Sequence, residues 1–91
     1  MKGKELVLPL KAQWYNMIES GEKKEEYREI KPYWQKRLDG KEFDTVTFTY
    51  GYTKRRMTYK CNGIRKDTGN PKWGAVSGVV YYVISLGERI L

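Results

Sequence analysis

The first twenty residues change from a strand pattern to a helix pattern. Residues 5–10 (ELVLPL) form a short apolar run with a proline near its end, which is typical of a strand at a sheet margin, because proline donates no ladder hydrogen bond. The period then becomes helical, with apolar residues at i, i+4, i+7 and i+8, namely Leu10, Trp14, Met17 and Ile18. We predict a strand over residues 5–10 and a helix over about residues 11–20, which ends where Gly21 accommodates a left-handed backbone.

The next segment predicts a short strand and a second short helix. Alternation from residue 25 places Glu26 and Arg28 on one side of an extended segment and Glu25 and Tyr27 on the other. The helix is expected to begin near Pro32, because proline suits the first helical turn, and to end at the Asp-Gly pair of residues 39–40. Its core face is expected to carry Trp34 and Leu38.

The second half of the chain reads as strands. Residues 43–50 (FDTVTFTY) alternate apolar side chains with threonines, which predicts a half-buried strand, and residues 57–64 (MTYKCNGI) predict its antiparallel partner. Residues 65–74 (RKDTGNPKWG) have the composition of a loop. Residues 77–86 (SGVVYYVISL) are apolar on both faces, as in a central strand covered on each side.

These elements predict one small α+β domain over residues 1–91. The order is strand, helix, short strand, helix and then mostly antiparallel strands. A small curled sheet or partly open β-barrel with two short helices at its ends would bury the apolar faces. A chain of 91 residues supports one core, not two.

The net charge of the chain indicates which class of binding partner to expect. Eighteen Lys+Arg against eleven Asp+Glu give a net charge of +7, which favours a polyanionic partner, although basic balance also serves solubility alone. The chain has no histidine and one cysteine, Cys61, so we expect no zinc site, no cofactor and a reducing, cytoplasmic location. We see no signal peptide and no membrane-spanning run, and we expect a monomer.

A motif lies between the two predicted helices. Residues 21–28 (GEKKEEYR) contain G-x-K-x-x-E-x-R, with Gly21, Lys23, Glu26 and Arg28 at its four fixed positions. With the preceding helix and the β-rich second half, this stretch resembles the ASCH domain family of the PUA-like superfamily. The resemblance implies a small β-barrel with flanking helices and a cleft beside the motif. It also implies a role in RNA metabolism, which is RNA binding in most members and nucleoside or RNA chemistry in a few.

One branch of that family, the acetylcytidine amidohydrolases, suggests a catalytic alternative. It uses the motif lysine together with a threonine three residues later, and a further glutamate from its β region. Lys23 matches the lysine, but Glu26 stands at the threonine position and the later glutamate has no alignable counterpart.

The motif side chains also have a chemical logic of their own. Arg28 can hold the Glu26 carboxylate with two parallel hydrogen bonds, and Glu26 can orient the Lys23 ammonium. We expect Glu26 and Arg28 to be buried and paired, with Lys23 pointing into the same cavity, where the trio would recognise a nucleobase edge or a phosphate. The alternative is a solvated run of surface charges, in which each pair contributes only about 0–1 kcal/mol.

A second basic region follows the motif. It contains Lys54, Arg55 and Arg56 in the predicted hairpin turn, together with Lys60, Arg65, Lys66 and Lys72, which we expect on one rim. Basic groups bind phosphates and aromatic faces stack unpaired bases. Among the nearby aromatics, Trp73 reads equally well as a stacking or a packing residue and Tyr50 reads as core.

The remaining assignments are structural. Trp14 and Trp34 read as core residues by their helical spacing, and Cys61 as a buried apolar residue.

Three functions follow from these patterns. The first is binding of RNA, or of a nucleotide from it, in a basic cleft that uses Lys23, Glu26, Arg28, Lys54, Arg55, Arg56 and Trp73. The second is an enzyme, either a nucleoside amidohydrolase or a metal-assisted ribonuclease, with Lys23 and Glu26 as catalytic residues. The third is a protein-interaction module that uses exposed aromatic residues.

Overall fold

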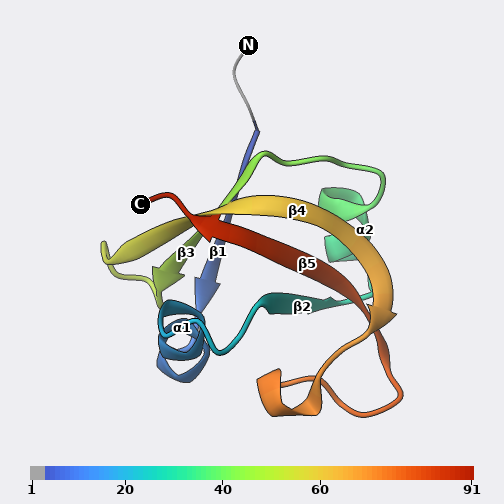
Figure 1. The fold of residues 1–91 in the computed structure, drawn as a ribbon. Helices are drawn as coiled ribbons and strands as arrows, with labels where there is room; N and C mark the ends of the chain where they lie inside the picture. The colour runs from blue at the N-terminus through green and yellow to red at the C-terminus, as the bar shows by residue number, and fades with distance from the viewer. Residues whose placement is uncertain (1–3) are drawn as a thin grey trace.

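The computed structural model describes residues 4–91. It contains five strands, two α-helices and one 3₁₀ turn (Figure 1), in the order β1 (Glu5–Leu10), α1 (Ala12–Glu19), β2 (Glu25–Glu29), α2 (Pro32–Leu38), β3 (Thr45–Tyr50), β4 (Arg56–Thr68), η1 (Pro71–Trp73) and β5 (Val80–Arg89). Both predicted helices and the strands at residues 5–10 and 25–29 are therefore confirmed. Within the described residues, no helix is long and apolar enough to cross a membrane.

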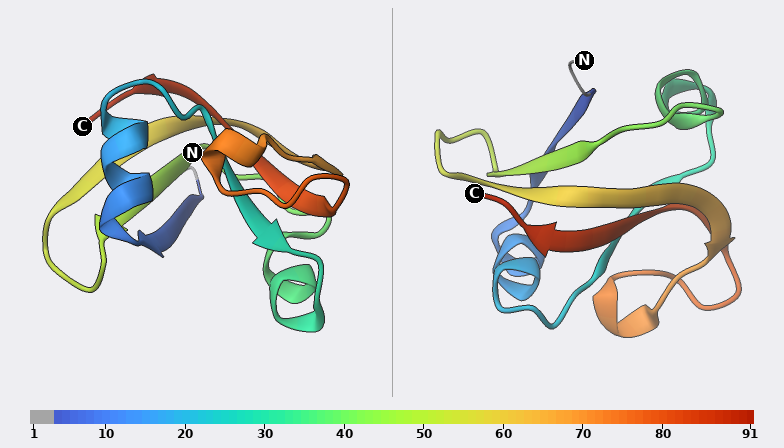
Figure 2. Two further views of the ribbon diagram at one scale, coloured as in Figure 1. Left: turned by 90° about the horizontal axis from the view of Figure 1, so that it is seen from below. Right: turned by 45° about the horizontal axis from the view of Figure 1, so that its top comes forward.

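The five strands form one curled sheet that resembles half a barrel (Figure 2). The strand order is β1-β3-β4-β5-β2, with β1 parallel to β3 and the other neighbours antiparallel. This confirms the expected α+β class and the curled, mostly antiparallel sheet. Because β1 and β2 end the order, each has one edge that no other strand covers.

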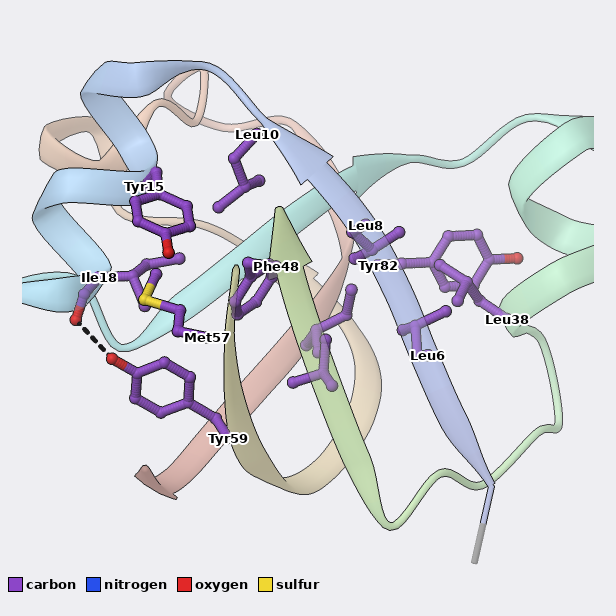
Figure 3. Packing of buried hydrophobic residues seen from close by; sticks show 12 residues of the cluster. Leu6, Leu8, Leu10, Tyr15, Ile18, Leu38, Phe48, Met57, Tyr59 and Tyr82 are labelled. Carbon is purple, nitrogen blue, oxygen red and sulfur yellow. Dashed lines mark hydrogen bonds between the residues drawn. The ribbon is translucent and has the colours of Figure 1, made fainter. Parts of the chain in front are cut away.

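The main core lies inside the curl, under both helices (Figure 3). Strand β1 alternates exposed and buried residues and places Leu6, Leu8 and Leu10 in this core. Helix α1 contributes Tyr15 and Ile18, and α2 contributes Leu38. The Tyr59 hydroxyl donates to the Ile18 carbonyl at 3.1 Å, which joins β4 to α1.

Strand β5 is buried on both faces, as its apolar composition predicts. Tyr82 and Ile84 belong to the main core, whereas Val83, between them, packs with Tyr27 and Ala75 in a second cluster on the opposite face. This second cluster holds the segment that follows β4 against the sheet.

The predicted boundary after residue 64 is wrong. Strand β4 continues to Thr68, so only the part of the 65–74 segment after Thr68 is a loop. The strand pairs with β3 over its first residues and with β5 from Tyr59 onward, and its register with β5 shifts between Tyr59 and Ile64. Gly63, with φ 115°, lies within this irregularity. The bend turns one strand from one neighbour to the next and contributes to the curl of the sheet.

The burial of two elements also differs from prediction. The helix α1 buries Tyr15 and Ile18, while Trp14 and Met17 are only partly buried. In β3 the threonines Thr47 and Thr49 are buried as well as the apolar residues, and side chains of the two neighbouring strands, Glu5 and Thr58, are hydrogen-bonded to the Thr47 hydroxyl. Cys61 is partly buried rather than fully buried.

Two adjacent residues of β1 test the position of the core. Leu8 is 1% exposed and Val7 is 48% exposed. We expect Leu8→Ala to lower the free energy of unfolding by about 2–5 kcal/mol because it leaves a cavity, and the matched control Val7→Ala to change it by about 0.5 kcal/mol or less. Urea denaturation measures both. Equal losses would contradict the inward orientation of Leu8.

Candidate functional site

The turn after α1 aims Lys23 into the protein. Gly21 takes the left-handed conformation expected of it, with φ 88°, and its amide donates to the Ile18 carbonyl. The Lys23 amide then donates to the Met17 carbonyl at 3.0 Å, so the residue is held against the last helical turn. From Glu25 the chain is extended as β2, which brings Glu26 and Arg28 to the same face.

Three charged side chains of this segment converge, as predicted. The Lys23 ammonium donates to Glu26 Oε1, and Arg28 donates to Glu26 Oε2 at 3.0 Å. Lys23 is 2% exposed and Glu26 is 4% exposed, so this is a buried ion pair and not a solvated run of charges. Burial lowers the pKa of Lys23 below its usual range; Arg28 adds to the lowering and Glu26 opposes it.

The same side chains cap the free edge of the sheet at Tyr27. The Tyr27 amide donates to Glu26 Oε1 at 3.2 Å, and the Tyr27 carbonyl accepts from Arg28 at 2.8 Å. Arg28 also donates to the Pro9 carbonyl of β1 at 3.3 Å. One guanidinium therefore links the two edge strands of the half-barrel.

All three tryptophans of the chain line one pocket above this trio. Trp14 from α1, Trp34 from α2 and Trp73 from η1 surround a space of about 190 Å³ whose walls include Lys23, Glu26 and Arg28. The Lys23 ammonium lies 5.0 Å from the Trp14 ring centroid, and the Arg28 guanidinium lies 5.2 Å from that of Trp34. These distances are within the range of cation–π attraction.

The positions of Trp14 and Trp34 differ from those that helical spacing predicts. Trp14 and Trp34 were expected only in the core; Trp34 does pack against the core, but both also form pocket walls. Gly74 completes the contact with Trp14. Its φ is 100°, and a Cβ atom there would lie 2.9 Å from the Trp14 ring, so glycine is the residue that fits.

Hydrogen bonds hold the Trp73 segment on the sheet. The Tyr27 hydroxyl donates to Glu25 at 2.9 Å and accepts from the Asn70 amide at 2.9 Å. The Val76 amide donates to the Tyr81 hydroxyl at 3.0 Å. Burial raises the pKa of Tyr27 to about 12. Its hydroxyl therefore stays protonated, and continues to donate to Glu25, well above neutral pH.

The second basic region does not form one rim. Lys54, Arg55 and Arg56 lie at the turn between β3 and β4 and do not line the tryptophan pocket. Lys66 lies ten residues further along β4 than Arg56, and Lys72 lies in η1, so the predicted common rim is wrong.

Arg55 is already engaged by the fold. It donates to Glu19 at 3.1 Å and lies over the rings of Tyr15 and Tyr50, with centroid distances of 5.2 and 5.0 Å. Lys54 and Arg56 are exposed beside it. All three cations of the hairpin are therefore exposed to solvent, and Arg55, whose side chain is 55% exposed, is also held by Glu19.

Comparison of the chain with protein-family models, curated proteins and solved structures finds no match.

The buried ion pair predicts a large stability effect. Glu26→Gln removes the charge that compensates the buried Lys23 ammonium, and we expect a loss of about 3–5 kcal/mol in the free energy of unfolding. The matched control is Glu29→Gln, because the Glu29 side chain is 71% exposed, its bridge to Lys31 spans 3.6 Å and such pairs contribute about 0–1 kcal/mol. Chemical denaturation at pH 7 gives both values.

A double variant separates charge from packing. If the loss comes from the uncompensated ammonium, Lys23→Met combined with Glu26→Gln is more stable than Glu26→Gln alone. A Glu26→Gln protein as stable as the parent would show that the pair is not formed.

Proposed function

We propose that the protein binds RNA, or a nucleotide from it, by enclosing one base in the tryptophan pocket. The observation that carries this proposal is that every tryptophan of the chain lines one pocket together with a Lys-Glu-Arg trio, of which Lys23 and Glu26 are buried and Arg28 is partly buried. Maintaining buried charges beside a pocket is costly unless each is paired. Here both cations hydrogen-bond to the same carboxylate, and the pocket above them has a volume of about 190 Å³.

The pocket offers what an unpaired base requires. Tryptophan faces stack on bases of any identity, and polar groups read the edge of the base. Glu26 Oε1 accepts from both Lys23 and the Tyr27 amide, and Glu26 Oε2 accepts from Arg28. An ammonium has three donors and Lys23 gives one to Glu26, so its remaining donors suit an acceptor such as a base carbonyl or a phosphate oxygen.

The resemblance of the 21–28 segment to the ASCH motif supports the same proposal. The motif residues Lys23, Glu26 and Arg28 are the three that converge, and the curled sheet is compatible with a PUA-like barrel. Membership in that family and its RNA-related role are part of the proposal. The net charge of +7 agrees with a polyanionic ligand.

Binding can be followed through the tryptophans themselves. We expect single-stranded RNA and mononucleotides to quench the intrinsic fluorescence, and RNA affinity to fall steeply with salt because bound phosphates release counterions. Trp73→Ala should weaken binding about 5- to 150-fold, the range for loss of one stacking partner, whereas Trp73→Phe keeps a ring and most of the affinity. Absence of affinity for single-stranded and structured RNA at low salt would end this proposal.

A hydrolytic function is the second candidate, and the lowered pKa of Lys23 favours it. A neutral lysine could take a proton from water as the water attacks an acyl carbonyl, and return it to the departing amine. The tight contact with Glu26 opposes this by stabilising the ammonium, so binding remains the first proposal. Among residues 4–91, no cluster of three or more Cys, Asp or Glu residues has the arrangement of a metal site.

The enzyme is tested by turnover. The protein is incubated with acetylated cytidine, and separately with RNA and a divalent metal, and the products are quantified. If hydrolysis occurs, Lys23→Met should abolish it, whereas the control Lys24→Met, at the exposed neighbouring lysine, should not. Equal activity of the parent and Lys23→Met would indicate a contaminating enzyme.

A further inference from the structure

Tyr52 projects into solvent from the tip of the hairpin that joins β3 to β4. It is 96% exposed, the highest value among the exposed large apolar side chains of residues 4–91. A ring in this position buries almost no surface, so the hydrophobic stability of the fold does not account for a tyrosine here.

The backbone that carries Tyr52 is braced. The Gly51 amide donates to the Leu10 carbonyl at 2.8 Å, and the Tyr50 amide donates to the Arg55 carbonyl at 2.8 Å. The Thr53 hydroxyl donates to the Tyr50 carbonyl at 2.7 Å. A ligand that stacks on Tyr52 therefore meets a preorganised support, which lowers the ordering cost of binding.

An apolar pocket lies beside this ring. It has a volume of about 250 Å³ and is formed by Pro9, Leu10, Lys11, Gly51 and Tyr52. Its lining is mostly aliphatic, the exposed Tyr52 lies at its margin, and Lys11 adds one ammonium. Flat faces next to a cation suit an unpaired base and its phosphate.

Charge indicates an anionic occupant. Residues 45–66, which include the hairpin, contain six Lys or Arg and no Asp or Glu. Lys11, Lys54, Arg55 and Arg56 are exposed around the tip, and Arg55 also donates to Glu19. An uncharged or basic protein segment would gain little from this surface.

One hydrogen bond links a wall residue of the apolar pocket to a wall residue of the tryptophan pocket. Pro9 belongs to the walls of the apolar pocket, and the Pro9 carbonyl accepts from Arg28, which lines the tryptophan pocket. Figures 1 and 2 show the hairpin on one side of α1 and the η1 segment on the other. A strand bound at both pockets would therefore pass α1, near the hydrogen bond that connects β1 to β2.

We propose that Tyr52 and its apolar pocket form a second base-stacking site, so that the ligand is a single-stranded nucleic acid segment that places one base in each pocket. This inference rests on the proposed function, and it assigns a strand rather than a free nucleotide as the preferred ligand. Phosphates of that strand lie near Lys11, Lys54 and Arg56.

Two kinds of ligand test the inference. The probes are the four ribonucleoside monophosphates, followed by tryptophan quenching, and ten-nucleotide single-stranded homopolymers, followed by fluorescence anisotropy. We expect Tyr52→Ala to weaken binding of the ten-nucleotide RNAs at least tenfold and to leave mononucleotide affinity within twofold of the parent. Tyr52→Phe should keep the affinity, because the ring remains.

The controls separate this inference from the proposed function. Ile90→Ala removes another exposed apolar side chain, outside the residues that line either pocket, and should alter neither measurement. If mononucleotides bind but Tyr52→Ala leaves the affinity for ten-nucleotide RNAs unchanged, the second site is wrong and the proposed function stands. If the parent protein binds neither class of ligand, both are wrong. Retention of the parent's thermal midpoint by Tyr52→Ala confirms that an affinity loss is not caused by unfolding.

Discussion

The arrangement of the site depends on the Glu26 carboxylate, which accepts hydrogen bonds from Lys23, Arg28 and the Tyr27 amide. Without it, a 2%-exposed lysine would lie in the interior with no compensating charge, and burial of an unpaired charge is among the most expensive features a fold can contain. The carboxylate also fixes the direction of Arg28. Because Arg28 reaches the Pro9 carbonyl on β1, this one group influences how far the half-barrel opens.

Each of the two cations of the trio lies beside an aromatic wall of the tryptophan pocket. Lys23 lies near Trp14 and Arg28 lies near Trp34, so each helix supplies one ring to one cation. Charged side chains at the edge of a sheet discourage another strand from pairing there. At the free edge of β2, Glu26 accepts from the Tyr27 amide and Arg28 donates to the Tyr27 carbonyl, so neither group is available to another strand. The motif therefore protects an open sheet edge and lines a pocket with the same atoms. A purely structural role would explain the first of these results, but it would not require an open space bordered by every tryptophan of the chain.

Much of the fold could be predicted from periodicity, because α1, β1 and β5 have the simple patterns of amphipathic, edge and central elements. The continuation of β4 beyond Ile64 could not, since residues 65–68 have the local composition of a loop and only pairing with β5 keeps them extended. In the site, the spacing of Lys23, Glu26 and Arg28 indicated convergence. The position of Trp14 in the pocket wall could not be predicted from the sequence. Helical spacing identifies the face of a helix that points inward, but it does not distinguish a filled core from a pocket. The contact between Trp14 and Gly74 joins residues sixty positions apart, and no local pattern carries it.

The distribution of charge divides the proposed recognition between two places. The tryptophan pocket is lined by two cations, Lys23 and Arg28, and by two carboxylates, Glu26 and Glu29, so little net charge remains there to attract a polyanion over a distance. The hairpin, which lies beside α1, carries three exposed cations, Lys54, Arg55 and Arg56, opposed at Arg55 by Glu19, so it keeps a net positive charge. Phosphate contacts generally supply affinity and position, while contacts to bases supply selectivity. For a nucleic acid ligand, the hairpin would therefore determine how strongly affinity depends on salt, and the tryptophan pocket would determine which base is preferred.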